Sequence, residues 1–279
     1  MKHVCVYFLL LVSHWVLAEP VSFEEVTFSS HQSVLSGTIA MPNDQKISAA
    51  VIFVHGSGKQ TRYTQLAERF AENGIAALVY DKRGVGKSAG TFEDKNPVSE
   101  SNLSLLADDA SAALKVLEGH PKLQNIPLGM TGLSQAGWIV PLAAVNSGAT
   151  DFIVLWSGPV TKVSEEDILS KHTKDQDSSK VPSYAEALAA RTRPYVWPKF
   201  LGKDTDSMES LKQIDIPGLW VFGEKDGSIP VDLSIENIKR LNQGGRRFEY
   251  VLFSNEGHMN IKPSISMVID WIKSLPSKR

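Results

Sequence analysis

The chain has 279 residues, of which 42% are hydrophobic and 22% charged, and its formal net charge is −2. This composition is ordinary for a globular protein with a substantial core, and the length allows one large α/β domain or two small ones. Because the sequence has no block of basic residues and no interleaving of aromatic and basic residues, we expect no nucleic-acid binding.

The first 18 residues have the order of a secretory signal peptide. One lysine precedes an apolar run from Val4 to about Leu17, and Ala18 comes just before Glu19-Pro20. The run is short for a membrane span, which needs about 20 apolar residues. We expect cleavage after Ala18, export to the periplasm or the exterior, and no stable membrane span in the mature chain. The alternatives are an uncleaved anchor or a buried first strand.

The only cysteine, Cys5, lies inside this signal segment and lacks the sequence context of a lipid anchor. The mature chain then has neither a disulfide nor a thiol nucleophile.

Hydrophobic patterns after the signal predict strands that alternate with helices. Residues 21–28 and 33–42 alternate as an antiparallel pair at a sheet edge would. The strands that follow are predicted at 49–55, 75–81, 126–132, 151–158, 218–226 and 246–253. The helices are predicted at 64–74, 103–119, 135–145, 231–242 and 264–275. This alternation predicts the α/β class, with a mostly parallel central sheet and helices on both faces.

One stretch, from Pro159 to about Ile214, carries no convincing buried strand. It contains helical pieces at 164–172 and 184–191, an aromatic patch at 194–200, and a polar segment, 171–183, that is typical of a mobile linker. Long insertions between core strands are commonly lids. We therefore expect residues 19–279 to form a single domain with a small helical cap inserted at about 159–214.

Residues 81–90, DKRGVGKSAG, resemble the end of a phosphate-binding loop. The complete motif requires a glycine five residues before Gly86, and Asp81 stands at that place. We interpret the segment as a strand-to-helix turn and expect no ATPase activity.

The stretch TGLSQAGW, residues 131–138, nearly matches the nucleophile elbow Gly-x-Ser-x-Gly. Gly132 and Ser134 fit the motif, but Ala136 stands where a second glycine is usual. Ser134 lies between a predicted strand and a predicted helix, which is the context that the motif requires. Taken alone, the stretch is also compatible with an ordinary turn serine. We expect the methyl group of Ala136 to be tolerated and Gly137 to be a helix-packing residue.

A nucleophilic serine needs a base and a group that orients the base. Asp226 ends a predicted strand, and His258 follows the last predicted strand in a loop. Because functional groups of open α/β sheets lie at the carboxyl ends of strands, we predict Ser134, His258 and Asp226 as the catalytic residues. Glu224 and Asp232 are the alternatives for the acid.

A tetrahedral intermediate also needs hydrogen-bond donors for its oxyanion. We predict the backbone N–H groups of Ser57 and Gln135 for this role, with Gly56 as an alternative to Ser57. His55 is expected to brace this loop through a structural hydrogen bond. The remaining histidines show no metal-ligand spacing, so we expect no metal or cofactor; they include His31, His120 and His172.

These motifs occur in the order typical of the α/β-hydrolase superfamily: HGSG, DKRGVGKS, GLSQAG, GEKDGSIP and EGHMN. The chain resembles the exported, serine-aminopeptidase-like and acyl-esterase branch of that superfamily. The resemblance covers nearly all of the mature chain and implies the α/β-hydrolase fold. It also implies that Asp81–Ser88 is a structural loop near the active-site rim and that the 159–214 insertion caps the pocket. Ala136 is the departure from the family pattern.

A serine nucleophile favours acyl transfer, since relatives that cleave epoxides or carbon–halogen bonds carry an aspartate there. We expect hydrolysis of carboxylic esters or thioesters, or of small amides, through an acyl-enzyme. One alternative is an aminopeptidase in which Glu165, Glu166 and Asp167 hold the substrate's amino group, although such a cluster is typical of a solvated first helical turn. Another is a non-catalytic binding protein with the same fold. Substrate identity and oligomeric state stay open.

Overall fold

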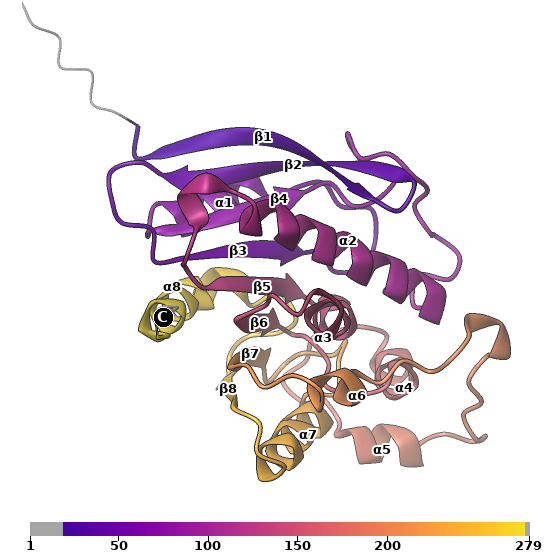
Figure 1. Ribbon diagram of the computed structural model, residues 1–279. Helices are drawn as coiled ribbons and strands as arrows, with labels where there is room; N and C mark the ends of the chain where they lie inside the picture. Colours follow the sequence, from indigo (N-terminus) through magenta and orange to yellow (C-terminus); the bar gives the residue numbers. More distant parts are fainter. Residues whose placement is uncertain (1–18, 277–279) are drawn as a thin grey trace, which may run out of the picture.

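The computed structural model describes residues 19–276, so the predicted signal peptide, residues 1–18, lies outside the described residues. Eight strands form one sheet in the order β1-β2-β4-β3-β5-β6-β7-β8 (Figure 1). The pairs β1–β2 and β2–β4 are antiparallel, and the other five pairs are parallel. The strands are β1 (Val21–Ser30), β2 (Ser33–Pro42), β3 (Ala49–Val54), β4 (Ile75–Tyr80), β5 (Leu128–Leu133), β6 (Phe152–Trp156), β7 (Gly218–Gly223) and β8 (Phe248–Phe253). The predicted mostly parallel sheet with an antiparallel edge is confirmed.

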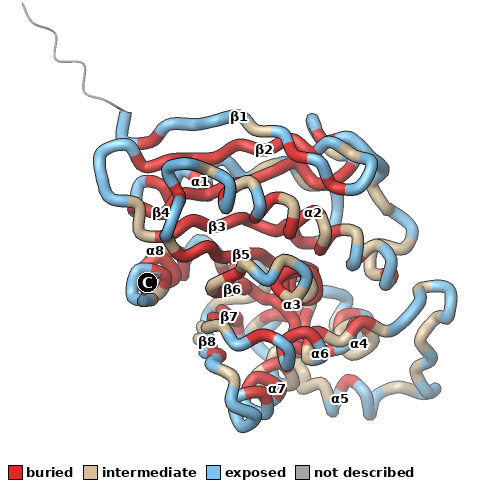
Figure 2. Tube along the Cα trace, viewed as in Figure 1, coloured by how far each residue is buried: buried red, intermediate tan, exposed pale blue. Residues whose placement is uncertain are grey.

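Helices cover both faces of this sheet, as predicted. The inner strands are buried on both sides (Figure 2), and β3 shows how: Ala49, Val51 and Phe53 lie on the face that α1 and α8 cover, whereas alternate residues lie on the face that α2, α3 and α7 cover. The helices are α1 (Thr64–Ala71), α2 (Glu100–Glu118), α3 (Ala136–Ser147), α7 (Val231–Gln243) and α8 (Ile261–Ser274), with a short 3-10 helix, η1 (Pro121–Leu123). Helix α2 begins earlier than predicted because the side chain of Ser99 caps it by accepting a hydrogen bond from Asn102 N.

The long segment between β6 and β7 holds four short helical elements: α4 (Val163–Thr173), α5 (Tyr184–Ala189), η2 (Lys199–Leu201) and α6 (Ser207–Leu211). It projects beside α3 and α7 (Figure 1). Helices α4 and α5 share a small apolar cluster of their own, made by Ile168, Leu169 and Ala187. We call residues 159–214 the insertion. Within residues 19–276, no helix is both long and apolar enough to cross a membrane.

Candidate active site

Ser134 lies at the turn between β5 and α3. Its φ is 57°, in the left-handed region that is unfavourable for a residue with a side chain. Two backbone hydrogen bonds hold the turn: Ser134 N donates to Trp156 O at 3.0 Å, and Gly137 N donates to Ser134 O at 2.8 Å. The sharp turn therefore presents the serine at the carboxyl end of the sheet, as a nucleophile elbow does.

Small residues on both sides make this turn possible. A Cβ on Gly132 would overlap the methyl group of Ala136 and would lie 2.8 Å from Val54 O. Ala136 is fully buried, and its methyl group fits because the residue opposite is a glycine. A Cβ on Gly137 would lie 2.5 Å from the ring of Pro159, so Gly137 is the helix-packing residue that the sequence predicts.

His258 and Asp226 are in direct contact. His258 Nδ1 donates to both carboxylate oxygens of Asp226, at 2.9 and 3.0 Å, which leaves Nε2 for another partner. Asp226 is fully buried and also accepts hydrogen bonds from the backbone N–H groups of Ser228 and Ile229, at 2.8 and 3.2 Å. These bonds fix the carboxylate and the tautomer of the imidazole ring.

The two alternative acids do not contact His258. The side chain of Glu224 is exposed, and its backbone N–H donates to Phe253 O. Asp232 accepts a hydrogen bond of 3.0 Å from the backbone N–H of Tyr184. Of the three acidic residues considered from the sequence, only Asp226 has the position that an orienting acid requires.

The electrostatic environment of His258 raises the pKa of its imidazole above the ordinary 6.5. Burial has the largest single effect and lowers the pKa, because it disfavours the charged ring. The hydrogen bonds and charge of Asp226, together with the negative charges of Asp177 and Asp175, outweigh burial. The site thus stabilises the imidazolium that a general base becomes.

Ser134 and His258 open into one cavity of about 480 Å³, although no hydrogen bond joins the two side chains. The predicted oxyanion residue Ser57 lines the same cavity. Most of the wall comes from the insertion: Val163, Glu166, Asp167, Ser170, Lys171, Asp175, Tyr195, Trp197, Pro198 and Leu201. Residues from distant parts of the chain therefore meet around the candidate nucleophile.

Acidic side chains of α4 form part of this wall. Burial raises the pKa of the Glu166 carboxyl to about 8, and the charges of Asp167, Asp175 and Asp226 add to the effect. Asp167 accepts hydrogen bonds from Lys171 Nζ at 2.6 Å and from Tyr195 OH at 2.7 Å. Glu166 and Asp167 both line the cavity, and the interpretation of a solvated first helical turn is wrong for Glu166, whose carboxyl is desolvated.

The HGSG loop lies beside the nucleophile. A Cβ on Gly56 would lie 3.3 Å from Ser134 Cβ, so this backbone approaches the serine closely. The backbone N–H groups of Ser57 and Gln135 donate no hydrogen bond within residues 19–276. His55 is buried, contacts Tyr80 O through Nε2 at 2.5 Å, and has its pKa lowered to about 4 by burial. It braces the loop and does not line the cavity.

The carboxylate of Asp81 occupies the centre of the loop of residues 81–88. The Asp81 carboxylate accepts hydrogen bonds from the Arg62 guanidinium and from Lys87 N, and a Cβ on Gly86 would lie 2.6 Å from that carboxylate. Arg83 pairs with Asp109 in the interior. A carboxylate at the centre of the loop repels phosphate, which agrees with its interpretation as a structural turn.

Two site residues were missed by the sequence analysis. Lys82 is buried behind the HGSG loop, and Asp177 of the insertion contacts the backbone of His258. Lys82 belongs to a stretch interpreted only as a turn, and Asp177 to a stretch interpreted as a mobile linker. The one available signal concerned Lys82: it directly follows a predicted buried strand, where a lysine without a partner is uncommon.

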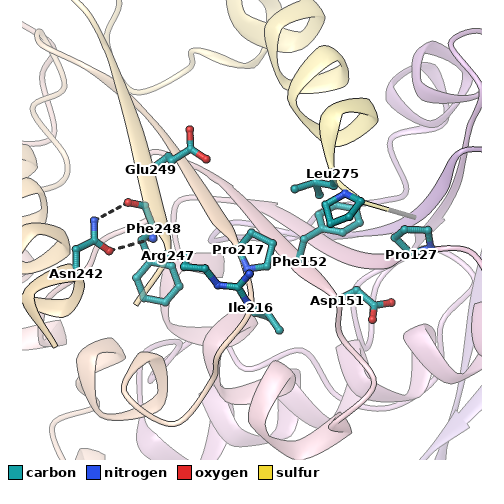
Figure 3. A pocket seen from close by; sticks show the side chains of 11 residues that line it. Pro127, Asp151, Phe152, Ile216, Pro217, Asn242, Arg247, Phe248, Glu249 and Leu275 are labelled. Atoms are coloured by element: carbon teal, nitrogen blue, oxygen red, sulfur yellow. Dashed lines mark hydrogen bonds between the residues drawn. The ribbon is translucent and has the colours of Figure 1, made fainter. Parts of the chain in front are cut away.

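A second cavity, of about 520 Å³, is drawn with its lining side chains in Figure 3, and its residues place it at the opposite end of the sheet. Pro127, Asp151 and Pro217, each directly before a strand, border it. The amide of Asn242 is already bound to the backbone of Phe248. Ligands of open α/β sheets bind at the carboxyl ends of strands, and the lining residues of this cavity include no Ser, Cys, His or Lys. The cavity at Ser134 is therefore the stronger candidate for the active site.

The sheet order and the elbow define an α/β-hydrolase. The esterase Pf2001 of Pyrococcus furiosus superposes with a TM-score of 0.64 at 17% identity, over 90% of this chain and 89% of that one. Acylaminoacyl peptidase of Pyrococcus horikoshii superposes with a TM-score of 0.67 at 17% identity, over 94% of this chain and 43% of that one. Acetyl xylan esterase of Paenibacillus sp. R4 superposes with a TM-score of 0.64 at 15% identity, over 92% of this chain and 90% of that one. At such identities the likeness shows the fold alone.

The family follows from the sequence match. Residues 45–200, more than half of the chain, match the family described as serine aminopeptidase, S33, and the chain belongs to this family of hydrolases. The polyketide transferase claH of Penicillium crustosum is 29% identical over 136 residues, which are 44% of this chain and 42% of that protein. The quorum-quenching protein AidA of Acinetobacter baumannii is 27% identical over 124 residues, which are 44% of this chain and 39% of that protein. The chain thus spans less than half the length of these curated relatives.

Proposed function

We propose that this protein is a serine hydrolase that cleaves carboxylic esters, or thioesters, of modest size through an acyl-enzyme. Ser134 is the nucleophile, His258 the base and Asp226 the residue that orients the base. One observation carries the proposal: a serine in a left-handed elbow shares a cavity with a histidine whose Nδ1 binds a fully buried aspartate. The fold shared with two esterases supports it.

The chemistry follows from these positions. Ser134 Oγ bonds to the carbonyl carbon while His258 Nε2 takes the hydroxyl proton, and the carbonyl electron pair moves onto oxygen. The N–H groups of Ser57 and Gln135 donate to that oxyanion. The intermediate collapses, and the alcohol or thiol leaves with the proton from His258. Water, deprotonated by the same nitrogen, then attacks the acyl-enzyme, and the acid is released as His258 returns the proton to Ser134 Oγ.

Two further parts of the proposal concern the whole chain. The insertion acts as a cap, because its side chains form most of the cavity wall. The protein is exported and processed after Ala18, on the strength of the N-terminal sequence pattern. Sequencing of the mature N-terminus tests export: a start near Glu19 supports it, and an intact Met1 contradicts it.

The test of the activity uses purified protein with p-nitrophenyl acetate and butyrate. Ser134→Ala is expected to lower kcat by about 10³-fold or more with an unchanged Tm, because it removes the nucleophile alone. Ser104→Ala, at an exposed site on α2, is the matched control and keeps full activity. A fluorophosphonate should label Ser134. Labelling of a different residue, or undiminished turnover by Ser134→Ala, contradicts the proposal.

A second candidate, an aminopeptidase, is favoured by the acidic wall. The ammonium group of a free amino terminus would be attracted to Asp175, and to Glu166 once its carboxyl, whose pKa is about 8, is charged; both residues line the cavity with Ser134. Aminoacyl-anilides and their N-acetylated forms separate the two activities. Turnover of free anilides alone, lost on N-acetylation and reduced in Glu166→Gln, would favour the peptidase. A non-catalytic binding protein would turn over neither class and would leave Ser134 unlabelled.

A further inference from the structure

Lys82 lies buried directly behind the two proposed oxyanion donors. Lys82 comes two residues after the end of β4, and it is only 5% exposed. Its Nζ donates to Gly56 O at 2.7 Å and to Gln135 Oε1 at 3.0 Å. Gly56 belongs to the HGSG loop and Gln135 to the elbow, so one ammonium group joins the two segments that carry the donors.

The first of these hydrogen bonds acts on the donor peptide itself. The carbonyl of Gly56 and the N–H of Ser57 belong to one peptide unit, and no peptide bond in residues 19–276 is cis. In a trans peptide the C=O and the N–H point in opposite directions. A cation bound to the carbonyl therefore leaves the N–H directed away from Lys82. The cation also polarises the unit, which makes that N–H a stronger donor.

The second hydrogen bond fixes the other donor residue. Gln135 is 1% exposed, and its side chain is held at both ends: Oε1 accepts from Lys82, and Nε2 donates to Pro97 O at 2.8 Å. The backbone N–H of Gln135 directly follows Ser134. A side chain tied in this way restricts the rotation of the first turn of α3, and with it the direction of that N–H.

We propose that Lys82 is a positioning residue for the oxyanion hole, whose ammonium group holds the Ser57 and Gln135 N–H groups in a fixed relation. The inference rests on the proposed function, because the oxyanion in question is that of the tetrahedral intermediate of acyl transfer. Lys82 touches no substrate. It acts by removing the reorganisation that two independent loops would otherwise undergo as the oxyanion forms.

The surroundings of Lys82 keep its charge effective. Burial lowers the pKa of Lys82 to about 8, and the amine is still mostly charged at neutral pH. The ring of Phe92 lies 5.7 Å from Nζ and covers the cation. A charge in such a site acts more strongly on its neighbours than it would in water.

The test compares Lys82→Met with Lys87→Met, a matched change at a lysine whose side chain is 76% exposed. Lys82→Met is expected to lower kcat for p-nitrophenyl esters about 10- to 100-fold with KM within about twofold, because only transition-state binding is lost. The affinity for a trifluoromethyl ketone, which forms a tetrahedral adduct with Ser134, should fall by a similar factor. Lys87→Met should match the unmodified protein in all three values.

A merely structural role for Lys82 gives a different pattern. It predicts a lower Tm, with kcat and the ketone affinity of the folded fraction unchanged, and this result overturns the inference. Where Lys82→Met does not fold, Gln135→Met takes its place, since it removes one arm of the link and should lower kcat by a smaller factor, again with KM nearly unchanged. If the unmodified protein cleaves no ester and its Ser134 resists fluorophosphonate, the proposed function itself fails. An active protein with an unaffected Lys82→Met refutes the positioning role alone.

Discussion

Asp177 Oδ2 accepts a hydrogen bond of 3.0 Å from the backbone N–H of His258. Oδ1 of the same carboxylate accepts one of 3.2 Å from the backbone N–H of Gly227. Asp177 belongs to the insertion, whereas Gly227 directly follows Asp226. One carboxylate of the insertion thus bridges the loops that carry the proposed acid and base.

The first prediction concerns this bridge. Asp177→Ala removes two hydrogen bonds to a carboxylate, each worth about 1.5–3 kcal/mol when made to a charged group. We expect kcat for esters to fall about tenfold, because the His258 loop loses its anchor, and Tm to fall as well. Asp94→Ala, at an exposed site, is the control. Steady-state kinetics measure kcat and thermal melts measure Tm for the two variants, and an unchanged kcat in Asp177→Ala would show that the bridge does not position His258.

The second prediction is a pH dependence. His258 must be neutral to accept a proton, and its pKa lies above 6.5, so kcat/KM should rise with pH through a midpoint above 6.5. Asp177 is one of the charges that raise this pKa. Asp177→Asn removes the charge, and the midpoint should therefore move to lower pH. Profiles of kcat/KM for both proteins test the sign. A midpoint that moves upward in Asp177→Asn rules out this electrostatic account.

The third prediction concerns the elbow. Gly132→Ala places a methyl group against that of Ala136 and should lower the free energy of unfolding by about 1–3 kcal/mol, the usual cost of overpacking. Ala136→Gly should cost about 1–2 kcal/mol, because it loses a buried methyl group as well as helix propensity. The double variant should be more stable than Gly132→Ala alone, since the clash is partly relieved. Chemical denaturation measures all three, and strict additivity would exclude contact between these positions.

Much of the sheet could be predicted because its strands are buried on both faces and therefore appear as continuous apolar runs, such as residues 49–54 and 75–80. The positions of Ser134, Asp226 and His258 follow from the same pattern, because the ends of parallel strands converge at one edge. No side-chain distance was needed to group these three residues.

The insertion could not be predicted in the same way. Its polar segment 171–183 has no hydrophobic periodicity, and the partners of Asp177 are backbone N–H groups that lie 50 and 81 residues away. Backbone donors leave no signal in a sequence. Glu166 was misjudged for a related reason: its helix carries three consecutive acidic residues near its start, and only the tertiary structure decides which of them face a cavity.

The last prediction tests the acidic wall. With a pKa of about 8, the Glu166 carboxyl is mostly neutral at pH 7 and gains its charge as the pH rises. Competitive inhibition of ester cleavage by benzyltrimethylammonium, whose charge does not titrate, should therefore strengthen between about pH 7 and 9. His258 and Lys82, whose pKa is about 8, also lose positive charge with rising pH and contribute a part of the change that does not depend on Glu166. In Glu166→Gln only that part should remain, while neopentylbenzene, the neutral analogue, should inhibit both proteins independently of pH. Identical pH profiles for the unmodified protein and Glu166→Gln would show that this carboxyl does not attract a bound cation.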